Sequence, residues 1–314
     1  MTREAPKSAA APPQGANCSP SGGSAAAEPQ AWGDPIYTAE LVELGYNNRA
    51  AVPEYPRFFE LYAEMSRGAV SALGPNLDLR YGPGAKETLD LFVPATRPRG
   101  TFVFMHGGYW RSLDKADFSF VASPLVEQGI AVALVNYDLC PFVTIATIVD
   151  ECRGALLWLL REGPRQGAAT DRIVVGGHSA GGHLAAMLFA TDWTTYGLSR
   201  APFAGGVTLS GVHDLEPLVL STMNADLRLD AEEARRVSPV HCAPTSDVPL
   251  VVAVGAEETS EFVRQSDLMF DAWPQNRPAG MRGPLRIAGR HHFSVVLDHA
   301  DAQSAVTRAV LDLF

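Results

Sequence analysis

The segment Val174–Gly182 restricts the folds open to this chain more than any other. A β-branched run ends in Gly-His-Ser-Ala-Gly at residues 177–181, and an apolar stretch follows from Leu184. This order predicts a buried strand, a sharp turn and a helix, with glycines where neighbouring backbone leaves no room for a side chain. We therefore expect Ser179 to have a strained backbone and to present its hydroxyl as a nucleophile at the carboxyl end of a sheet.

A second strand-like run ends in His-Gly-Gly-Tyr-Trp at residues 106–110. A glycine turn lets backbone amides converge on one point, as the stabilisation of an oxyanion requires. We expect the amides of Gly108, Tyr109 and Ala180 to form this oxyanion hole, and His106 to brace the loop rather than act as a base. Neither glycine-containing run has the Gly-x-Gly-x-x-Gly spacing of a dinucleotide-binding loop.

A serine nucleophile needs a base, and the base needs an orienting carboxylate. With a nucleophile in this strand-turn-helix context, both partners are expected downstream, in the order acid and then histidine. The strand-like run 249–255 is followed by Glu257 and Glu258, and a last short strand is followed by His291 and His292. Because neighbouring loop residues project in different directions, only one of each pair can complete the relay.

We expect the second member of each pair, Glu258 and His292, to act with Ser179, and the first member of each pair is the alternative. Asp214, after another strand-like run, is a further candidate acid, with a helix N-cap as its competing role.

Aromatic residues follow two of these strand ends. Trp110 and Tyr137, beside Tyr109, are expected to line a substrate wall, with core packing as the competing role. The eight histidines show no His-Glu-x-x-His or comparable ligand spacing, so we expect neither a metal nor a cofactor.

The segments 106–110, 177–183 and 258–266 together resemble the arylformamidase (kynurenine formamidase) branch of the α/β-hydrolases. The wider resemblance is to bacterial esterases of the hormone-sensitive-lipase type, and it extends from about Tyr37 to the C-terminus. It implies cofactor-free hydrolysis of a small aryl formamide, such as N-formyl-L-kynurenine, through an acyl-enzyme. A carboxylesterase for small aryl or acyl esters is the alternative, and a catalytically silent binding protein of the same fold is the remote one.

The resemblance assigns the nucleophile to Ser179, the histidine to His292 and the acid to Glu258. Animal members of the family carry Asp at the position of Glu258, and Asp-His-Phe-Asp where this chain has His-His-Phe-Ser at residues 291–294. Glutamate is an accepted triad acid, so these departures leave hydrolysis intact and bear on the substrate.

The chain divides into two parts of different composition. Residues 1–32 are dominated by Ala, Pro, Gly and Ser and are expected to form a disordered tail. Residues 33–314 are expected to form one α/β-hydrolase domain, in which residues 33–75 make a helical cap with helices at 38–50 and 57–71. Strand and helix alternate after the cap, which predicts a mostly parallel, twisted central sheet with helices on both faces.

Composition limits the kinds of partner that the chain is expected to bind. A net charge of −10 argues against nucleic acid or an anionic membrane, and the apolar runs are too short to span a bilayer. The partner is expected to be a small-molecule substrate, and a homodimer stays open. The first residues lack the apolar core of a secretion signal, so we expect a cytoplasmic protein. No Cys-x-x-Cys spacing occurs, which indicates free thiols at Cys18, Cys140, Cys152 and Cys242.

Overall fold

The computed structural model describes residues 37–314, so the expected tail at residues 1–32 lies outside the described part of the chain. The strands are β1 (Asn76–Arg80), β2 (Thr88–Phe92), β3 (Thr101–Met105), β4 (Ala131–Val135), β5 (Ile173–His178), β6 (Gly205–Leu209), β7 (Leu250–Gly255) and β8 (Leu285–Ile287). The α-helices are α1 (Ala39–Tyr46), α2 (Asn48–Ala51), α3 (Tyr55–Leu73), α4 (Ala122–Glu127), α5 (Ile145–Glu162), α6 (Ala180–Phe189), α7 (Asn224–Leu227), α8 (Ala231–Arg236), α9 (Ser260–Ala272) and α10 (Ala305–Leu311). Short 3-10 helices connect several of these elements.

All eight strands form one sheet in the order β1-β2-β4-β3-β5-β6-β7-β8. The strands β1 and β2 join it as antiparallel neighbours, and every pairing from β4 through β8 is parallel. A parallel arrangement places the carboxyl ends of β3, β5, β6 and β7 at one edge, where the motifs following these strands meet.

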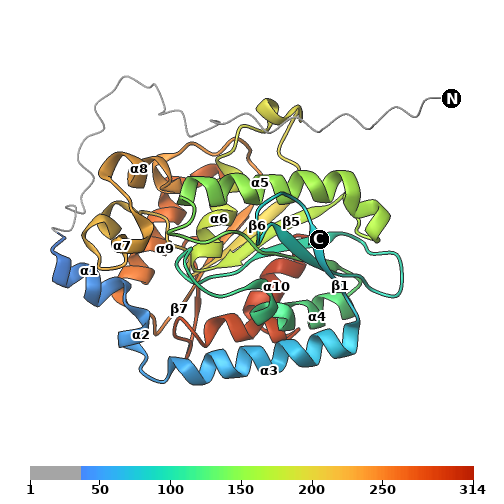
Figure 1. Cartoon of the computed structure of the whole chain (residues 1–314), viewed down its shortest axis with the longest axis horizontal. Coiled ribbons are helices and arrows are strands. Elements are labelled where there is room, and N and C mark those ends of the chain that lie inside the picture. The colour runs from blue at the N-terminus through green and yellow to red at the C-terminus, as the bar shows by residue number, and fades with distance from the viewer. Residues whose placement is uncertain (1–36) are drawn as a thin grey trace.

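The sheet is covered on both faces. Every residue of β3 through β7 is buried, as expected for strands sandwiched between helix layers. One apolar core contains side chains of α5, α6 and α9, and the second contains side chains of α3, α4 and α10. Figure 1 shows α5 and α6 on one side of the sheet and α3, α4 and α10 on the other. The predicted α/β-hydrolase architecture is therefore confirmed.

The N-terminal helices differ from the expectation in one detail. The stretch predicted as one helix over residues 38–50 is two helices, because Asn47 leaves the helical conformation between them and its side chain accepts a hydrogen bond from the Ala50 amide at 3.1 Å. The helix predicted at 57–71 is α3, which ends at Leu73 and is capped by the left-handed residue Gly74.

The thiol prediction is only partly correct. Cys140 and Cys152 are free and buried. Cys242 is disulfide-bonded, so the prediction is wrong for this residue, and Cys18 lies outside the described residues. Among residues 37–314, every helix is too short or too polar to cross a bilayer.

Candidate active site

Ser179 lies in the turn between β5 and α6, with φ 58° and ψ −119°. This left-handed conformation is strained for a residue with a side chain. A Cβ on Gly177 would lie 2.3 Å from the Gly181 carbonyl oxygen, and one on Gly181 would lie 1.9 Å from the Met105 carbonyl oxygen. Both glycines of the motif are therefore required by packing of backbone against backbone.

Three side chains from three strand ends form one hydrogen-bonded chain. His292 Nε2 lies 3.1 Å from Ser179 Oγ, and His292 Nδ1 lies 2.7 Å from Glu258 Oε2. With the ring proton on Nδ1, histidine donates to the carboxylate and accepts from the serine hydroxyl. The Glu258 side chain is completely shielded from solvent, so its attraction for a histidine cation is weakly screened.

The alternative acids and the alternative histidine take no part in the hydrogen bonds that join Ser179, His292 and Glu258. Glu257 is exposed. His291 turns its ring toward Phe58, with ring centroids 4.8 Å apart. Asp214 Oδ1 instead accepts a hydrogen bond from the Glu216 amide at 3.1 Å. The structure thus brings together Ser179, His292 and Glu258, and it separates the other candidates from them.

Ser210, which belongs to none of the sequence motifs above, supports the carboxylate. Its hydroxyl donates a hydrogen bond to Glu258 Oε1, and the Gly255 amide donates to the same oxygen at 2.8 Å. Ser210 directly follows β6 and has a left-handed φ of 52°. A serine at the carboxyl end of the strand next to β5, which carries Ser179 at its end, was the signal that could have identified it.

Two histidines flank Ser179, and each is neutral and structural. His178 donates from Nε2 to the His292 carbonyl oxygen at 3.0 Å, and burial holds its pKa well below the usual value. His183 donates from Nε2 to the Val237 carbonyl oxygen at 2.7 Å, and burial lowers its pKa to about 4. His178 thereby fixes the backbone that carries His292.

The loop after β3 presents its amides to the site. Gly108 has φ 115°, and a Cβ there would lie 2.1 Å from the Ser112 carbonyl oxygen. Tyr109 follows with φ 51°. The amides of Gly108 and Tyr109 have no acceptor among residues 37–314, and both residues line the same pocket as Ser179. Ala180 opens α6 directly after the serine, where helix amides lack intrahelical partners.

His106 braces this loop, as expected. Its Nδ1 lies 2.7 Å from the Gly107 carbonyl oxygen and its Nε2 lies 3.0 Å from Asn136 Oδ1, so the one N–H of the neutral ring donates to one of these two oxygens. Burial lowers the pKa of His106 to about 4, so the imidazole is neutral at physiological pH. His106 lies outside the pocket that contains Ser179.

The expected aromatic wall is wrong for two of its members. Trp110 is completely buried and donates from Nε1 to His183 Nδ1 at 3.1 Å. Tyr137 is also completely buried, and its ring stacks on His106 with centroids 4.3 Å apart. Neither residue lines the pocket. Consecutive left-handed residues turn the chain sharply here, so that Tyr109 contributes to the pocket and Trp110 packs in the core.

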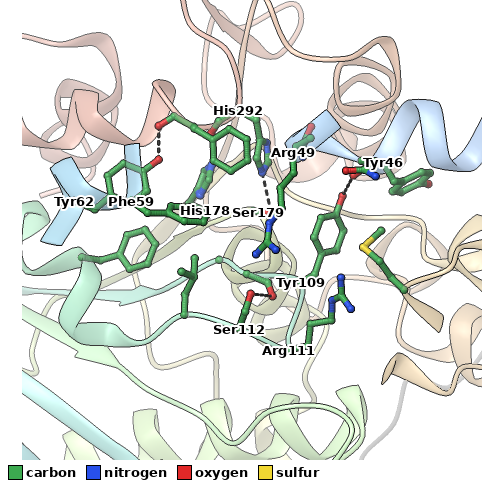
Figure 2. Close-up of a pocket in the computed structure, with 18 of the residues that line it drawn as sticks. Tyr46, Arg49, Phe59, Tyr62, Tyr109, Arg111, Ser112, His178, Ser179 and His292 are labelled. Atoms are coloured by element: carbon green, nitrogen blue, oxygen red, sulfur yellow. Dashed lines mark hydrogen bonds between the residues drawn. The ribbon is translucent and has the colours of Figure 1, made fainter. Parts of the chain in front are cut away.

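The pocket above Ser179 has an empty volume of about 760 Å³, including its open mouth. The helices α1, α2 and α3 border it, and Figure 2 shows how their side chains approach Ser179 and His292. Its walls differ in character. One group of lining residues is aromatic and consists of Phe59, Tyr62, Phe118 and Phe293, and the other is polar or charged and includes Glu43, Asn47, Asn48, Arg49, Arg111 and Thr222.

One group of side chains in the described chain has donor atoms close enough for a metal ion. These atoms, on Asp214, Glu216 and His241, lie within 4.8 Å of one another. None of the three lines the pocket of Ser179. Two arginines already approach them, with Arg264 Nη2 3.6 Å from Asp214 Oδ2 and Arg235 Nη1 3.3 Å from Glu216 Oε2.

The sheet, the strained serine after β5 and the hydrogen-bonded histidine and glutamate define the protein as a hydrolase of the α/β-hydrolase class. Comparison with known proteins narrows this class. The kynurenine formamidase of Salmo salar is 31% identical over 258 residues, which cover 80% of this chain and 84% of that protein. The kynurenine formamidase of Danio rerio is 29% identical, with 76% and 81% covered. This chain belongs to the kynurenine formamidase family.

Two further comparisons agree with the fold. A family model described as BD-FAE matches residues 89–197, which include the turn at Ser179. The crystal structure of a putative thioesterase from Silicibacter sp. TM1040 superposes with a TM-score of 0.76 at 31% identity, covering 86% of this chain and 99% of that one. The chain is a hydrolase whose relatives support action on formamides or esters.

Proposed function

We propose that this chain hydrolyses a small aryl formamide of the N-formyl-L-kynurenine type through a formyl-enzyme on Ser179. The observation that carries the proposal is the hydrogen-bonded series from Ser179 through His292 to Glu258. Ser179 and His292 line a pocket that is partly aromatic. Membership of the kynurenine formamidase family supports the choice of a formamide.

The first half of the reaction forms the formyl-enzyme. His292 Nε2 takes the proton of Ser179 as Oγ attacks the formyl carbon, and Glu258 stabilises the imidazolium. The amides of Gly108, Tyr109 and Ala180 donate hydrogen bonds to the oxyanion. When the tetrahedral intermediate collapses, the C–N bond breaks and His292 gives its proton to the leaving arylamine.

The second half returns the enzyme to its starting state. Water attacks the formyl ester while His292 accepts a proton from it, and formate leaves as the proton returns to Ser179. The aromatic lining residues suit the aryl group of the substrate, which can stack on their rings or meet their edges. These residues are Phe59, Tyr62, Phe118 and Phe293.

Turnover of N-formyl-L-kynurenine by the purified chain tests this proposal. We expect a kcat/KM of at least about 10⁴ M⁻¹s⁻¹, at the lower end of ordinary enzymes. Ser179→Ala should lower kcat by about 10³-fold or more while circular dichroism stays unchanged. Substantial activity in that variant would overturn the assignment of the nucleophile.

The second candidate function is a carboxylesterase for small aryl or acyl esters. The similarity to a putative thioesterase favours it. A thiol or a phenol leaves the tetrahedral intermediate more easily than an amine does, so its departure needs less proton donation from His292. Formylkynurenine turnover a hundredfold slower than turnover of short aryl acetates would select this alternative. The third hypothesis is a catalytically silent binding protein. A fluorophosphonate probe tests it, because the probe would not label Ser179 in such a protein.

A further inference from the structure

The pocket of Ser179 contains two arginines in different electrostatic situations. Arg111 Nη1 pairs with Asp226 Oδ2 at 2.5 Å, so its charge is largely balanced within the protein. Arg49 also lines the pocket, and no acidic side chain among residues 37–314 pairs with it. The described structure therefore presents one arginine without an acidic partner in the pocket that contains Ser179.

Aromatic rings support the guanidinium of Arg49. Its Cζ lies 5.3 Å from the centroid of the Tyr55 ring and 5.8 Å from that of Phe59, distances at which a ring face attracts a cation. Figure 2 shows the side chain extending from α2 into the pocket in the same region as Ser179 and Tyr109. Stacking on rings leaves the edge of the guanidinium, with its N–H donors, available to a ligand.

Asn48, the neighbouring residue, adds a second donor. It lines the pocket and is only 4% exposed, yet its side-chain nitrogen has no hydrogen-bond partner among the described residues. A buried amide without an acceptor is unusual, and a ligand that supplies one removes the penalty.

The acidic lining residue does not compensate Arg49. Glu43 Oε1 accepts hydrogen bonds from the Thr222 amide at 2.7 Å, from the Thr222 hydroxyl at 2.8 Å and from the Ser221 hydroxyl at 3.0 Å. Burial raises the pKa of Glu43, but these hydrogen bonds outweigh it and hold the pKa below the usual value. The carboxylate is thus ionised and committed to the loop that contains Ser221 and Thr222.

We infer that Arg49, together with Asn48, recognises a carboxylate on the leaving part of the substrate, so that the enzyme selects acidic aryl substrates over neutral ones. The planar guanidinium can bind both oxygens of a carboxylate, and the asparagine amide, whose nitrogen is enclosed in the structure described, can donate to one of them once its side chain rotates toward the pocket. This inference rests on the proposed function of the Ser179 site. Because Arg49 is exposed to solvent, its attraction for a carboxylate is screened, and we expect a selectivity of about tenfold to a hundredfold rather than more.

The test uses two matched pairs of substrates. The formamide pair is N-formyl-L-kynurenine and its neutral carboxamide, and the ester pair is an acetoxyphenyl propanoate and its neutral carboxamide. The measured quantity is the selectivity ratio, which is kcat/KM for the acid divided by kcat/KM for the amide. We expect a ratio above about 10 in the wild-type chain, and Arg49→Gln should lower it by about tenfold or more. Arg49→Lys keeps the charge and should give an intermediate ratio.

A matched control removes the other arginine together with its partner. The double variant Arg111→Gln with Asp226→Asn should keep the wild-type selectivity ratio within about twofold, because it deletes a balanced pair. A wild-type ratio near one for both pairs, or an unchanged ratio in Arg49→Gln, overturns the inference. As a readout independent of turnover, L-kynurenine should raise the Tm of Ser179→Ala more than its carboxamide does, and adding Arg49→Gln should abolish that difference.

Failure of the inference and failure of the proposed function give different results. Formamides that are cleaved without discrimination between acid and amide leave the function standing and remove the role of Arg49. Formamides that are not cleaved, with an Arg49-dependent ratio in the ester pair, remove the formamidase function and leave the carboxylate site standing.

Discussion

Ser210 and Glu258, which follow neighbouring strands of the sheet, are joined by a hydrogen bond from the serine hydroxyl to Oε1 of the carboxylate. The other carboxylate oxygen, Oε2, lies 2.7 Å from His292 Nδ1. One oxygen is therefore anchored to the scaffold and the other faces the histidine. The carboxylate can hold the ring in one orientation because its own position is fixed from behind.

Removal of this anchor should lower turnover without abolishing it. In Ser210→Ala, the Gly255 amide still donates to Glu258, so we expect kcat to fall by about tenfold with KM nearly unchanged. Steady-state kinetics on the best substrate measure both values. A KM that rises while kcat stays constant would contradict a positioning role for Ser210.

Substitution of each candidate carboxylate by its isosteric amide shows which of them acts as the acid. Glu258→Gln should lower kcat by about 10³-fold, because an amide cannot stabilise the imidazolium. Glu257→Gln should stay within about twofold of the wild type, since Glu257 is exposed and lies outside the relay. If Asp214→Asn had the largest effect of the three, the acid would belong to the earlier strand.

Trp110 should matter for stability more than for substrate binding. Trp110→Phe loses the hydrogen bond to His183 and leaves a gap in the core, so the free energy of unfolding should fall by about 2 kcal/mol. Phe142→Ala is the control, because Phe142 is 91% exposed and its loss should change stability very little. Urea denaturation measures the first effect, and a KM within about twofold of the wild type checks that the pocket is intact.

Buried neutral histidines should make stability depend on pH in the acid range. Burial lowers the pKa of His299 from 6.5 to about 3, and that of His106 from 6.5 to about 4. When the pKa of a histidine is lower in the folded state, the unfolded chain binds more protons than the folded chain below about pH 6.5. The free energy of unfolding is therefore highest above that pH. It then falls by about 1.4 kcal/mol per pH unit for each such group until the folded pKa is reached.

His299→Leu isolates one of these contributions. His299 packs against the Phe102 and Phe104 rings, and its Nδ1 has no hydrogen-bond partner in the described part of the chain. The variant should lose stability less steeply than the wild type between about pH 6 and pH 4, by roughly one proton. Equal slopes in urea denaturation across this range would show that His299 is not buried in its neutral form.

Local backbone demands were predictable from the sequence, and side-chain directions were not. The strand, glycines and helix around Ser179 follow from steric limits within a few residues. The break at Asn47 and the burial of Trp110 depend on how a chain turns after a single unusual backbone angle, which residue types alone do not determine. The hydrogen bond between Ser210 and Glu258 joins two strand ends 48 positions apart, so only the assembled sheet reveals it.

The contact of Gly181 with the Met105 carbonyl has a consequence for the descendants of this protein. A Cβ at Gly181 would lie 1.9 Å from that oxygen whether or not residue 179 carries a hydroxyl. A lineage that lost Ser179 and its proposed chemistry would still be under selection to keep the glycine, because the sheet could not otherwise close around the turn. The glycine is thus required by the fold, whereas the serine is required only by the proposed chemistry. Descendants of this protein could therefore lose Ser179 while they keep Gly181.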